Sequence, residues 1–182
     1  EFRGGKGSLY EGGLRIPFLA QWPGRIRGGQ VSHLMFAQYD ILATLTGLAG
    51  ARTPKDTDGI SILPTLLGEE AAGHKQATHP HFYWEFGNMQ AVRINNWKGL
   101  HIRNKKSWEL YDLKEDISET TNLASKHPEI IARMNRIIAE SHEPTRPGSY
   151  TTRERHERDR QAKWGTSRPQ ASPRIKGRNR IK

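Results

Sequence analysis

Short strand-like runs separated by tight turns occupy residues 81–113, and they constrain the fold more than any other feature of the sequence. Each run is rich in aromatic residues or alternates apolar with polar positions, as strands with one buried face do. The runs are residues 81–86, 90–94, 97–103 and 108–113. Asn95-Asn96 suits a tight hairpin because asparagine tolerates positive φ, and residues 104–106 make a further turn. We predict a meander of three or four antiparallel strands.

A helix is predicted directly after this meander, over residues 127–140. Its apolar side chains recur at helical spacing and would form one face that packs against the sheet. They are Ile130, Ile131, Met134, Ile137 and Ile138.

The sequence before the meander contains shorter signals. The apolar run 16–20 is interpreted as a short buried strand, and residues 34–36 as another short strand. Residues 37–48 have helical spacing, and their apolar face is expected to pack in a core; it contains Ile41, Leu42, Leu45 and Leu48. A short helix should begin near Pro64, and the polar residues 69–80 should form a surface loop.

Positive charge is concentrated at the C-terminal end. Residues 151–182 carry a net charge of +8, whereas the whole chain of 182 residues carries +10. A segment so polar buries too little apolar surface to offset its chain entropy, so residues 146–182 are predicted to be disordered, with transient helix at 152–163. The absence of cysteine excludes disulfides and thiolate metal sites.

A glycine-rich loop, Gly4-Gly5-Lys6-Gly7-Ser8, precedes the sequence Tyr10-Glu11-Gly12-Gly13-Leu14-Arg15. A lysine in such a loop offers a compact charge for a tetrahedral anion, although the loop alone also fits an ordinary surface turn. The spacing excludes a Walker A loop. Glu11 and Arg15 are interpreted as an ion pair that holds the loop in shape, with direct substrate contact as the alternative.

This loop, followed by Trp22-Pro23-Gly24, resembles the signature of the sulfatases within the alkaline-phosphatase-like superfamily. Further similar motifs follow in the order that the family shows, so that the resemblance covers residues 3 to about 142. They lie at residues 40–50, 58–68, 91–98 and 109–124. One departure is Ile117, which stands where the family usually has proline.

The resemblance implies an α/β fold. Residues 1–75 would be the C-terminal edge of the catalytic core, residues 76–145 an antiparallel sheet with a helix, and residues 146–182 the basic tail. It implies hydrolysis of sulfuric esters, such as a sulfated small molecule or polysaccharide, with Lys6 contacting the sulfate. It also implies a formylglycine nucleophile, calcium or a similar divalent cation, and a periplasmic or secreted location.

The Cys/Ser-x-Pro-x-Arg sequence that yields formylglycine does not occur in this chain, and the metal ligands are expected upstream of Lys6. We therefore expect the chain to be the C-terminal portion of a larger enzyme, inactive alone and without a membrane span. The alternatives are a phosphodiesterase or phosphonate hydrolase of the same superfamily, and a non-catalytic fragment whose tail binds polyanions. His81, Trp84 and Glu85 would lie beside the cleft, where His81 either touches a sugar or is an ordinary surface residue.

Overall fold

The computed structural model describes residues 1–102, 107–144, 157–158, 161–162 and 165. Residues 1–141 form one compact unit, and the account below concerns that unit. The predictions for the turn at 104–106 and for the basic tail lie outside the described residues. The helices and strands, in chain order, are α1 (Glu11–Leu14), α2 (Asp40–Leu48), α3 (Leu63–Leu67), α4 (Glu69–Ala72), β1 (Phe82–Phe86), β2 (Met89–Ile94), β3 (Trp97–Ile102), β4 (Ser107–Asp112) and α5 (Pro128–Ser141).

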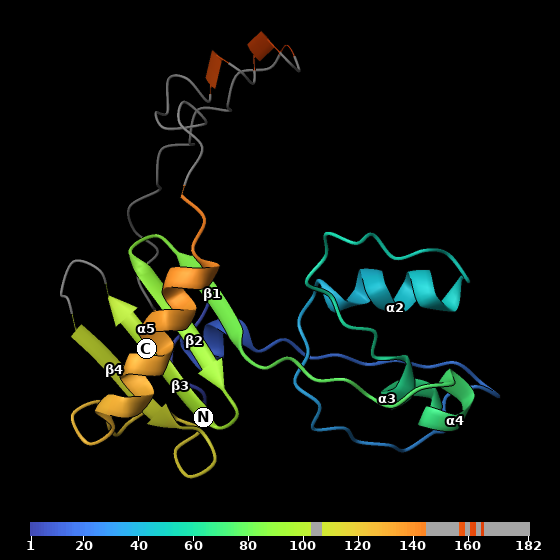
Figure 1. Ribbon diagram of the computed structural model, residues 1–182, viewed down its shortest axis with the longest axis horizontal. Helices are drawn as coiled ribbons and strands as arrows, with labels where there is room; N and C mark the ends of the chain where they lie inside the picture. The colour runs from blue at the N-terminus through green and yellow to red at the C-terminus, as the bar shows by residue number, and fades with distance from the viewer. Residues whose placement is uncertain (103–106, 145–156, 159–160, 163–164, 166–182) are drawn as a thin grey trace, which may run out of the picture. The chain divides into compact units, whose positions relative to one another are not determined.

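The predicted meander is confirmed. Within the described residues the strands form one antiparallel sheet in the order β1-β2-β3-β4 (Figure 1). The turn between β2 and β3 places Asn95 at φ 52°, the positive value for which asparagine is suited. Val92 lies opposite Tyr83 and Gly99, which fixes the register across the first three strands.

Helix α5 covers one face of the sheet, as its apolar spacing predicts (Figure 1). The core on this face joins α5 to alternate residues of the strands: Val92, Ile94, Leu110, Met134 and Ile137. Gly99 lies directly beneath the helix, where a Cβ atom would overlap the sulfur of Met134. The close approach of helix and sheet therefore requires glycine at this position.

The opposite face of the sheet is covered by the N-terminal residues of the chain. Their core again uses alternate strand positions: Leu9, Ala91, Leu100, Tyr111 and Leu113. Tyr10 and Leu14 pack against this cluster. The glycine-rich loop and the sheet, which are some eighty residues apart in sequence, thus share one core.

Residues 16–80 contain three short helices and a buried polar centre. The Asp40 carboxylate accepts backbone N–H groups of Ala37 and Ile60, both at 2.7 Å, and lies 2.8 Å from His79 Nε2. This carboxylate ties the start of α2 to the segment before α3 and to the residues that lead into β1. The helix predicted near Pro64 is confirmed as α3, whereas α4 occupies part of the predicted loop at 69–80.

Two predictions for this region are wrong. Residues 16–20 and 34–36 contain no strand, because a strand needs a neighbouring strand for its backbone groups and none lies beside them among the described residues. Helix α2 forms, but its expected core face is largely exposed, and it buries Asp40, Ala43 and Thr44 instead. The large exposed side chains on α2 are Leu42, Leu45 and Leu48.

Candidate active-site loop

The loop around Lys6 is folded back on itself by backbone hydrogen bonds. The Ser8 N–H donates to the Gly5 carbonyl at 3.0 Å, and the Gly12 N–H donates to the Arg3 carbonyl at 2.8 Å. Lys6 lies in the turn that these bonds close, with an exposed side chain. The structure thus presents the ammonium outward on a backbone of fixed shape.

The two glycines after Glu11 allow this folding. A Cβ atom on Gly12 would lie 2.7 Å from the carbonyl oxygens of Arg3 and Gly4, and one on Gly13 would overlap the Ser8 carbonyl. These clashes are with backbone, which cannot rotate away as a side chain can. Both positions are therefore restricted to glycine by the return of the loop.

A buried ionic cluster fastens the loop to the sheet. Lys98 Nζ of β3 donates to Glu11 Oε1 at 2.8 Å and lies 3.0 Å from Glu119 Oε1. The Glu11 N–H donates to Glu119 Oε2 at 2.7 Å. Glu11, Lys98 and Glu119 are 2%, 0% and 0% exposed. The charges can remain buried because each one is paired with an opposite charge, although Glu119 Oε1 has only its ion pair with Lys98 and no hydrogen-bond partner among the described residues.

Two arginines complete the environment of Glu11. Arg15 Nε donates to Glu11 Oε2 at 2.6 Å, and Arg93 Nη1 donates to the same atom at 3.3 Å. The ion pair predicted between Glu11 and Arg15 is confirmed. Burial by itself would raise the pKa of Glu11, but hydrogen bonds from Lys98 and Arg15 and the charges of Lys98 and Arg93 outweigh it and hold the pKa below its ordinary value.

Glu119 holds the cluster from an unfavourable backbone conformation. Its φ is 54°, a region that non-glycine residues enter at a cost of about 1–3 kcal/mol. Its carbonyl accepts a hydrogen bond from Arg3 at 2.8 Å while its carboxylate serves Glu11 and Lys98. The strained conformation thus directs two acceptors of one residue at the two ends of the loop.

A second attachment uses tyrosines around Glu109 of β4. The hydroxyls of Tyr10 and Tyr111 donate to Glu109 Oε2 at 2.7 and 2.6 Å, and Arg3 donates to the Tyr111 hydroxyl at 2.8 Å. Burial and the hydrogen bond to Glu109 raise the pKa of Tyr10 to about 12. The same causes raise the pKa of Tyr111. Both phenols therefore stay protonated and hold the loop throughout the physiological range.

The loop reaches the tip of the hairpin between β1 and β2. A Cβ atom on Gly7 would lie 3.9 Å from the ring of Phe86, which is 56% exposed. Lys6, next in the chain, makes no ion pair with any of the residues that the structure describes. No neighbour in the described ranges neutralises its charge, which is therefore available to an anion.

The other sequence candidates are divided between the two faces of the sheet. Trp84 packs against the core on the loop face and stacks on Phe82 at 5.6 Å. Glu85 accepts a hydrogen bond from the Tyr83 hydroxyl. His81 lines a shallow pocket beside α5, on the helix side of the sheet.

Sequence reasoning missed Lys98 and Glu119. Lys98 shares its strand face with the buried Leu100, so strict alternation would have indicated that its side chain points inward. No comparable signal exists for Glu119, whose partner Glu11 is 108 positions away in sequence.

Metal ligands and membrane-spanning helices were also sought. Within the described parts of the chain, no group of three or more histidine, aspartate or glutamate side chains is placed to hold a metal ion. None of the described helices combines the length and hydropathy needed to cross a membrane.

Comparison with known proteins finds sulfatases, both in the family that matches and among the individual relatives. The family described as "N-sulphoglucosamine sulphohydrolase, C-terminal" matches residues 5–143. An N-acetylgalactosamine-6-O-sulfatase of Bacteroides thetaiotaomicron is 31% identical over 149 residues, which cover 75% of this chain and 29% of that protein. Arylsulfatase G of Rattus norvegicus is 29% identical over 156 residues, covering 74% of this chain and 30% of that protein.

Solved structures show the same relationship. One comes from work on the metabolism of multiple glycosaminoglycans by Bacteroides thetaiotaomicron and superposes with a TM-score of 0.65 at 29% identity, covering 76% of this chain and 31% of that one. The i-CgsB protein in complex with a neocarrahexaose superposes with a TM-score of 0.62 at 26% identity, over the same shares of the two chains. The chain thus spans less than a third of the length of these relatives.

Proposed function

Because the chain belongs to the sulfatase family, as its C-terminal part, we propose that it supplies a sulfate-contacting lysine, Lys6, to a sulfuric ester hydrolase. The observation that carries the proposal is the attachment of the loop. The buried ionic cluster and the hydrogen bond from Tyr10 to Glu109 of the sheet fix its backbone, while the Lys6 ammonium stays exposed and unpaired among the described residues.

A fixed ammonium suits the chemistry of sulfate ester cleavage. The ester oxygen gains negative charge as the S–O bond breaks, and a positive group already held in place stabilises that charge without reorganising. Lys6 would bind one sulfate oxygen and orient the ester. The Glu11–Lys98–Glu119 cluster would act only by positioning the loop that carries Lys6.

The nucleophile and the divalent cation of the proposed reaction must be supplied by polypeptide other than the residues that the structure describes. The formylglycine that the family resemblance implies would supply the nucleophile, and the described residues offer no ligand cluster for the implied calcium. We propose that polypeptide preceding the loop provides both. The exposed apolar side chains of residues 16–48 support this, since surfaces of that kind usually face a partner. The periplasmic or secreted location implied by the resemblance remains a prediction.

Sulfate esters are favoured over the other chemistries. The relatives reported above are named sulfatases, which supports sulfate over the phosphodiester and phosphonate alternatives. Polyanion binding by the tail concerns residues outside the described part of the chain and stays a prediction from charge alone.

The test replaces Lys6 in an assembled enzyme, in which this chain follows its own in-frame upstream sequence or the upstream part of the Bacteroides relative. Lys6→Ala should lower kcat for an aryl sulfate by about 10²–10³, the usual effect of losing one such donor. Lys114→Ala removes an equally charged lysine, 70% exposed, and should leave kcat unchanged. Retention of most of the activity by Lys6→Ala would contradict the proposal.

The chain by itself provides a second check. We expect the purified 182-residue chain to hydrolyse no aryl sulfate with or without added calcium. Measurable turnover that follows the protein through purification would contradict the proposed division of the site.

A further inference from the structure

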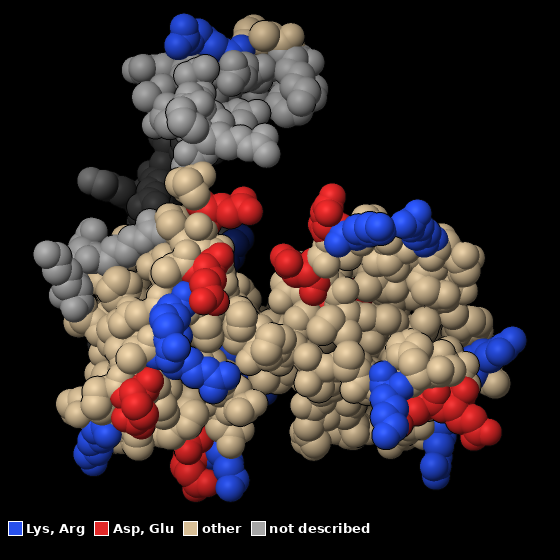
Figure 2. Space-filling model, in the orientation of Figure 1, with Lys and Arg blue, Asp and Glu red and all other residues tan. Residues whose placement is uncertain are grey.

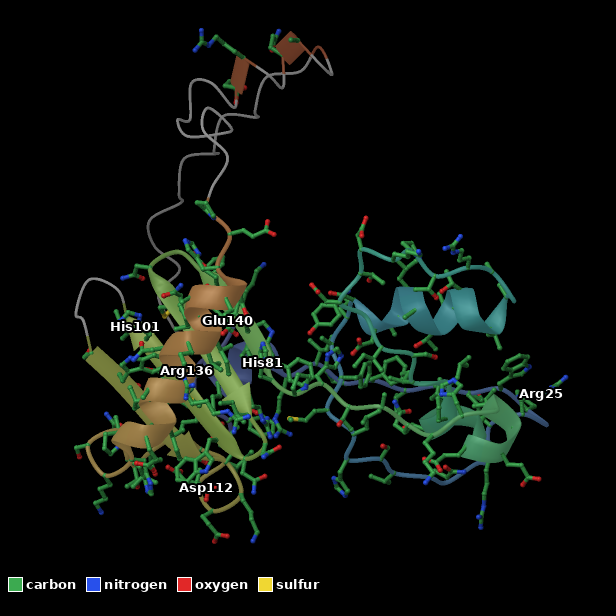
Figure 3. The ribbon with its side chains drawn as sticks, in the orientation of Figure 1. Arg25, His81, His101, Asp112, Arg136 and Glu140 are labelled. Atoms are coloured by element: carbon green, nitrogen blue, oxygen red, sulfur yellow. The ribbon has the colours of Figure 1, made fainter. Side chains whose placement is uncertain are left out.

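A shallow pocket of about 240 Å³ lies between α5 and the residue that precedes β1. It is lined by His81, Arg133, Arg136, Ile137 and Glu140. Figure 3 shows His81, Arg136 and Glu140 around α5 and the start of β1, and Figure 2 shows basic side chains over this helix with acidic side chains next to them. This pocket plays no part in holding the Lys6 loop.

The pocket and the loop lie on opposite faces of the sheet. Phe82 and Trp84 pack on the loop side together with Phe86, near the loop, whereas Tyr83 packs toward α5. Successive side chains alternate between faces, and His81 accordingly belongs with α5. A ligand in the pocket would therefore occupy a place distinct from the sulfate that Lys6 is proposed to contact.

The charges of the pocket are available to a ligand. Arg133 and Arg136 are three residues apart on α5, so they are neighbours on one face of the helix. Both are exposed, and neither forms an ion pair with any described residue. Two guanidinium groups that have no ion-pair partner in the described part of the chain offer forked donors that match the oxygens of a sulfate or carboxylate.

The remaining lining residues indicate more than a simple anion. Ile137 is largely buried and provides an apolar floor. The Glu140 carboxylate can only accept hydrogen bonds when ionised, and it would repel a bare anion while accepting from hydroxyl groups. His81 adds a ring nitrogen at the other wall. A sulfated sugar has the three features that such a lining matches, namely an anionic group, hydroxyls and an apolar ring face.

We propose that this pocket binds one sulfated sugar unit of a polysaccharide, as a second site apart from the reacting sulfate. The identification of the ligand as sulfated rests on the proposed function. The pocket is smaller than the roughly 300–1,000 Å³ of usual ligand pockets, so its occupant would be a single small unit that stays partly exposed to solvent. Such a site would hold the polymer while another of its units reacts.

The test measures binding to the full 182-residue chain by NMR titration and calorimetry, and needs no catalytic activity. The probes are N-acetylgalactosamine 6-sulfate, unsulfated N-acetylgalactosamine and inorganic sulfate. We expect the sulfated sugar to shift signals of His81 and of residues 133–140, and to bind about tenfold more tightly than either control probe, since a hydrogen bond to a charged group contributes about 1.5–3 kcal/mol. Equal affinity for inorganic sulfate, or shifts confined to other residues, would overturn the proposal.

Two double variants distinguish binding at this pocket from attraction by the net positive charge of the chain. Arg133→Ser with Arg136→Ser should weaken the sulfated sugar at least tenfold and leave the melting temperature unchanged, because both side chains are exposed. Arg27→Ser with Arg52→Ser removes the same charge from exposed positions elsewhere and should leave binding unchanged. Equal losses in the two double variants would reduce the effect to net charge and overturn the proposal.

Glu140→Gln tests the hydroxyl contact. The variant should bind inorganic sulfate more tightly than the native chain and lose much of its preference for the sugar, and an unchanged preference would contradict the role of the carboxylate. Binding at the pocket does not depend on Lys6. Failure of the Lys6 experiment with intact pocket binding would therefore reject the catalytic proposal alone.

Discussion

Apolar side chains are buried in the sheet and its two covering layers, whereas many of them are exposed in the stretch 16–80. Residues of the sheet such as Val92, Leu100 and Leu110 are fully buried, with a helix on one face and the glycine-rich loop on the other. Of the eleven large apolar side chains that are exposed among the described residues, nine lie between residues 16 and 48. The first region is complete as a packed layer structure, whereas the second has apolar surface that nothing in the described chain covers.

The comparison also shows that the glycine-rich loop is stabilised by the sheet and not by the stretch 16–80. Although the loop precedes residues 16–80 in sequence, its partners Lys98, Glu109 and Glu119 all come from the sheet and the segment after it. The stability of the sheet and the position of Lys6 are therefore coupled. Changes in the stretch 16–80 should affect the two much less.

The largest effect is expected from Lys98→Met. The change leaves the buried carboxylate of Glu119 without a cation and removes one of three from Glu11, and breaking a buried ion pair in this way costs about 3–5 kcal/mol. Urea unfolding of the native and variant chains measures the difference. Lys114→Met, at an exposed lysine, should change the unfolding free energy little, and a similar small loss for Lys98→Met would show that the cluster is not stabilising.

A matched pair of leucines tests the comparison directly. Leu100→Ala should lower the free energy of unfolding by about 2–5 kcal/mol, since Leu100 is 0% exposed. Leu45→Ala should change it by less than about 0.5 kcal/mol, since Leu45 is 56% exposed. Thermal and urea unfolding of both variants give the values, and equal losses would remove the distinction between the two regions.

Acid should loosen the loop face of the sheet. The pKa of Glu11 is held below its ordinary value of 4.5 in the folded chain. Its contribution to stability is therefore fully present above about pH 4.5 and is lost as the pH falls through the lowered pKa of the folded chain. Melting temperatures measured from pH 7 downward should therefore decline more steeply for the native chain than for Glu11→Gln. Parallel curves would mean that Glu11 does not contribute to the acid sensitivity.

A smaller effect is expected at the alkaline end. The pKa of Tyr10 is raised from 10.0 to about 12, so the hydroxyl stabilises the fold below pH 10 and its contribution is lost as the pH rises from 10 to 12. Tyr10→Phe removes the hydrogen bond to Glu109, should cost about 1 kcal/mol at neutral pH, and should reduce the decline above pH 10. Unfolding measured at pH 8, 10 and 11 checks both statements.

The sequence predicted elements that depend on their own residues and missed those that depend on distant partners. Alternation predicted the strands around Val92, and asparagine predicted the turn at Asn95, because both signals are local. The run 16–20 is apolar enough for a strand, yet its pairing partner must come from elsewhere, so its local signal misled. The site followed the same rule: the Glu11–Arg15 pair spans one helical turn and was predicted, while the attachments to Lys98 and Glu119 were not.

The conformation of Glu119 limits how this position can change during evolution. Glycine there would relieve the backbone yet lose the carboxylate that accepts from the Glu11 N–H and pairs with Lys98, and glutamine would preserve the shape yet leave the lysine short of a counter-charge. Each of these two replacements meets one requirement by giving up the other. Drift at this position should thus be rare unless a second change accompanies it, and sequences that differ at 119 should also differ at 98.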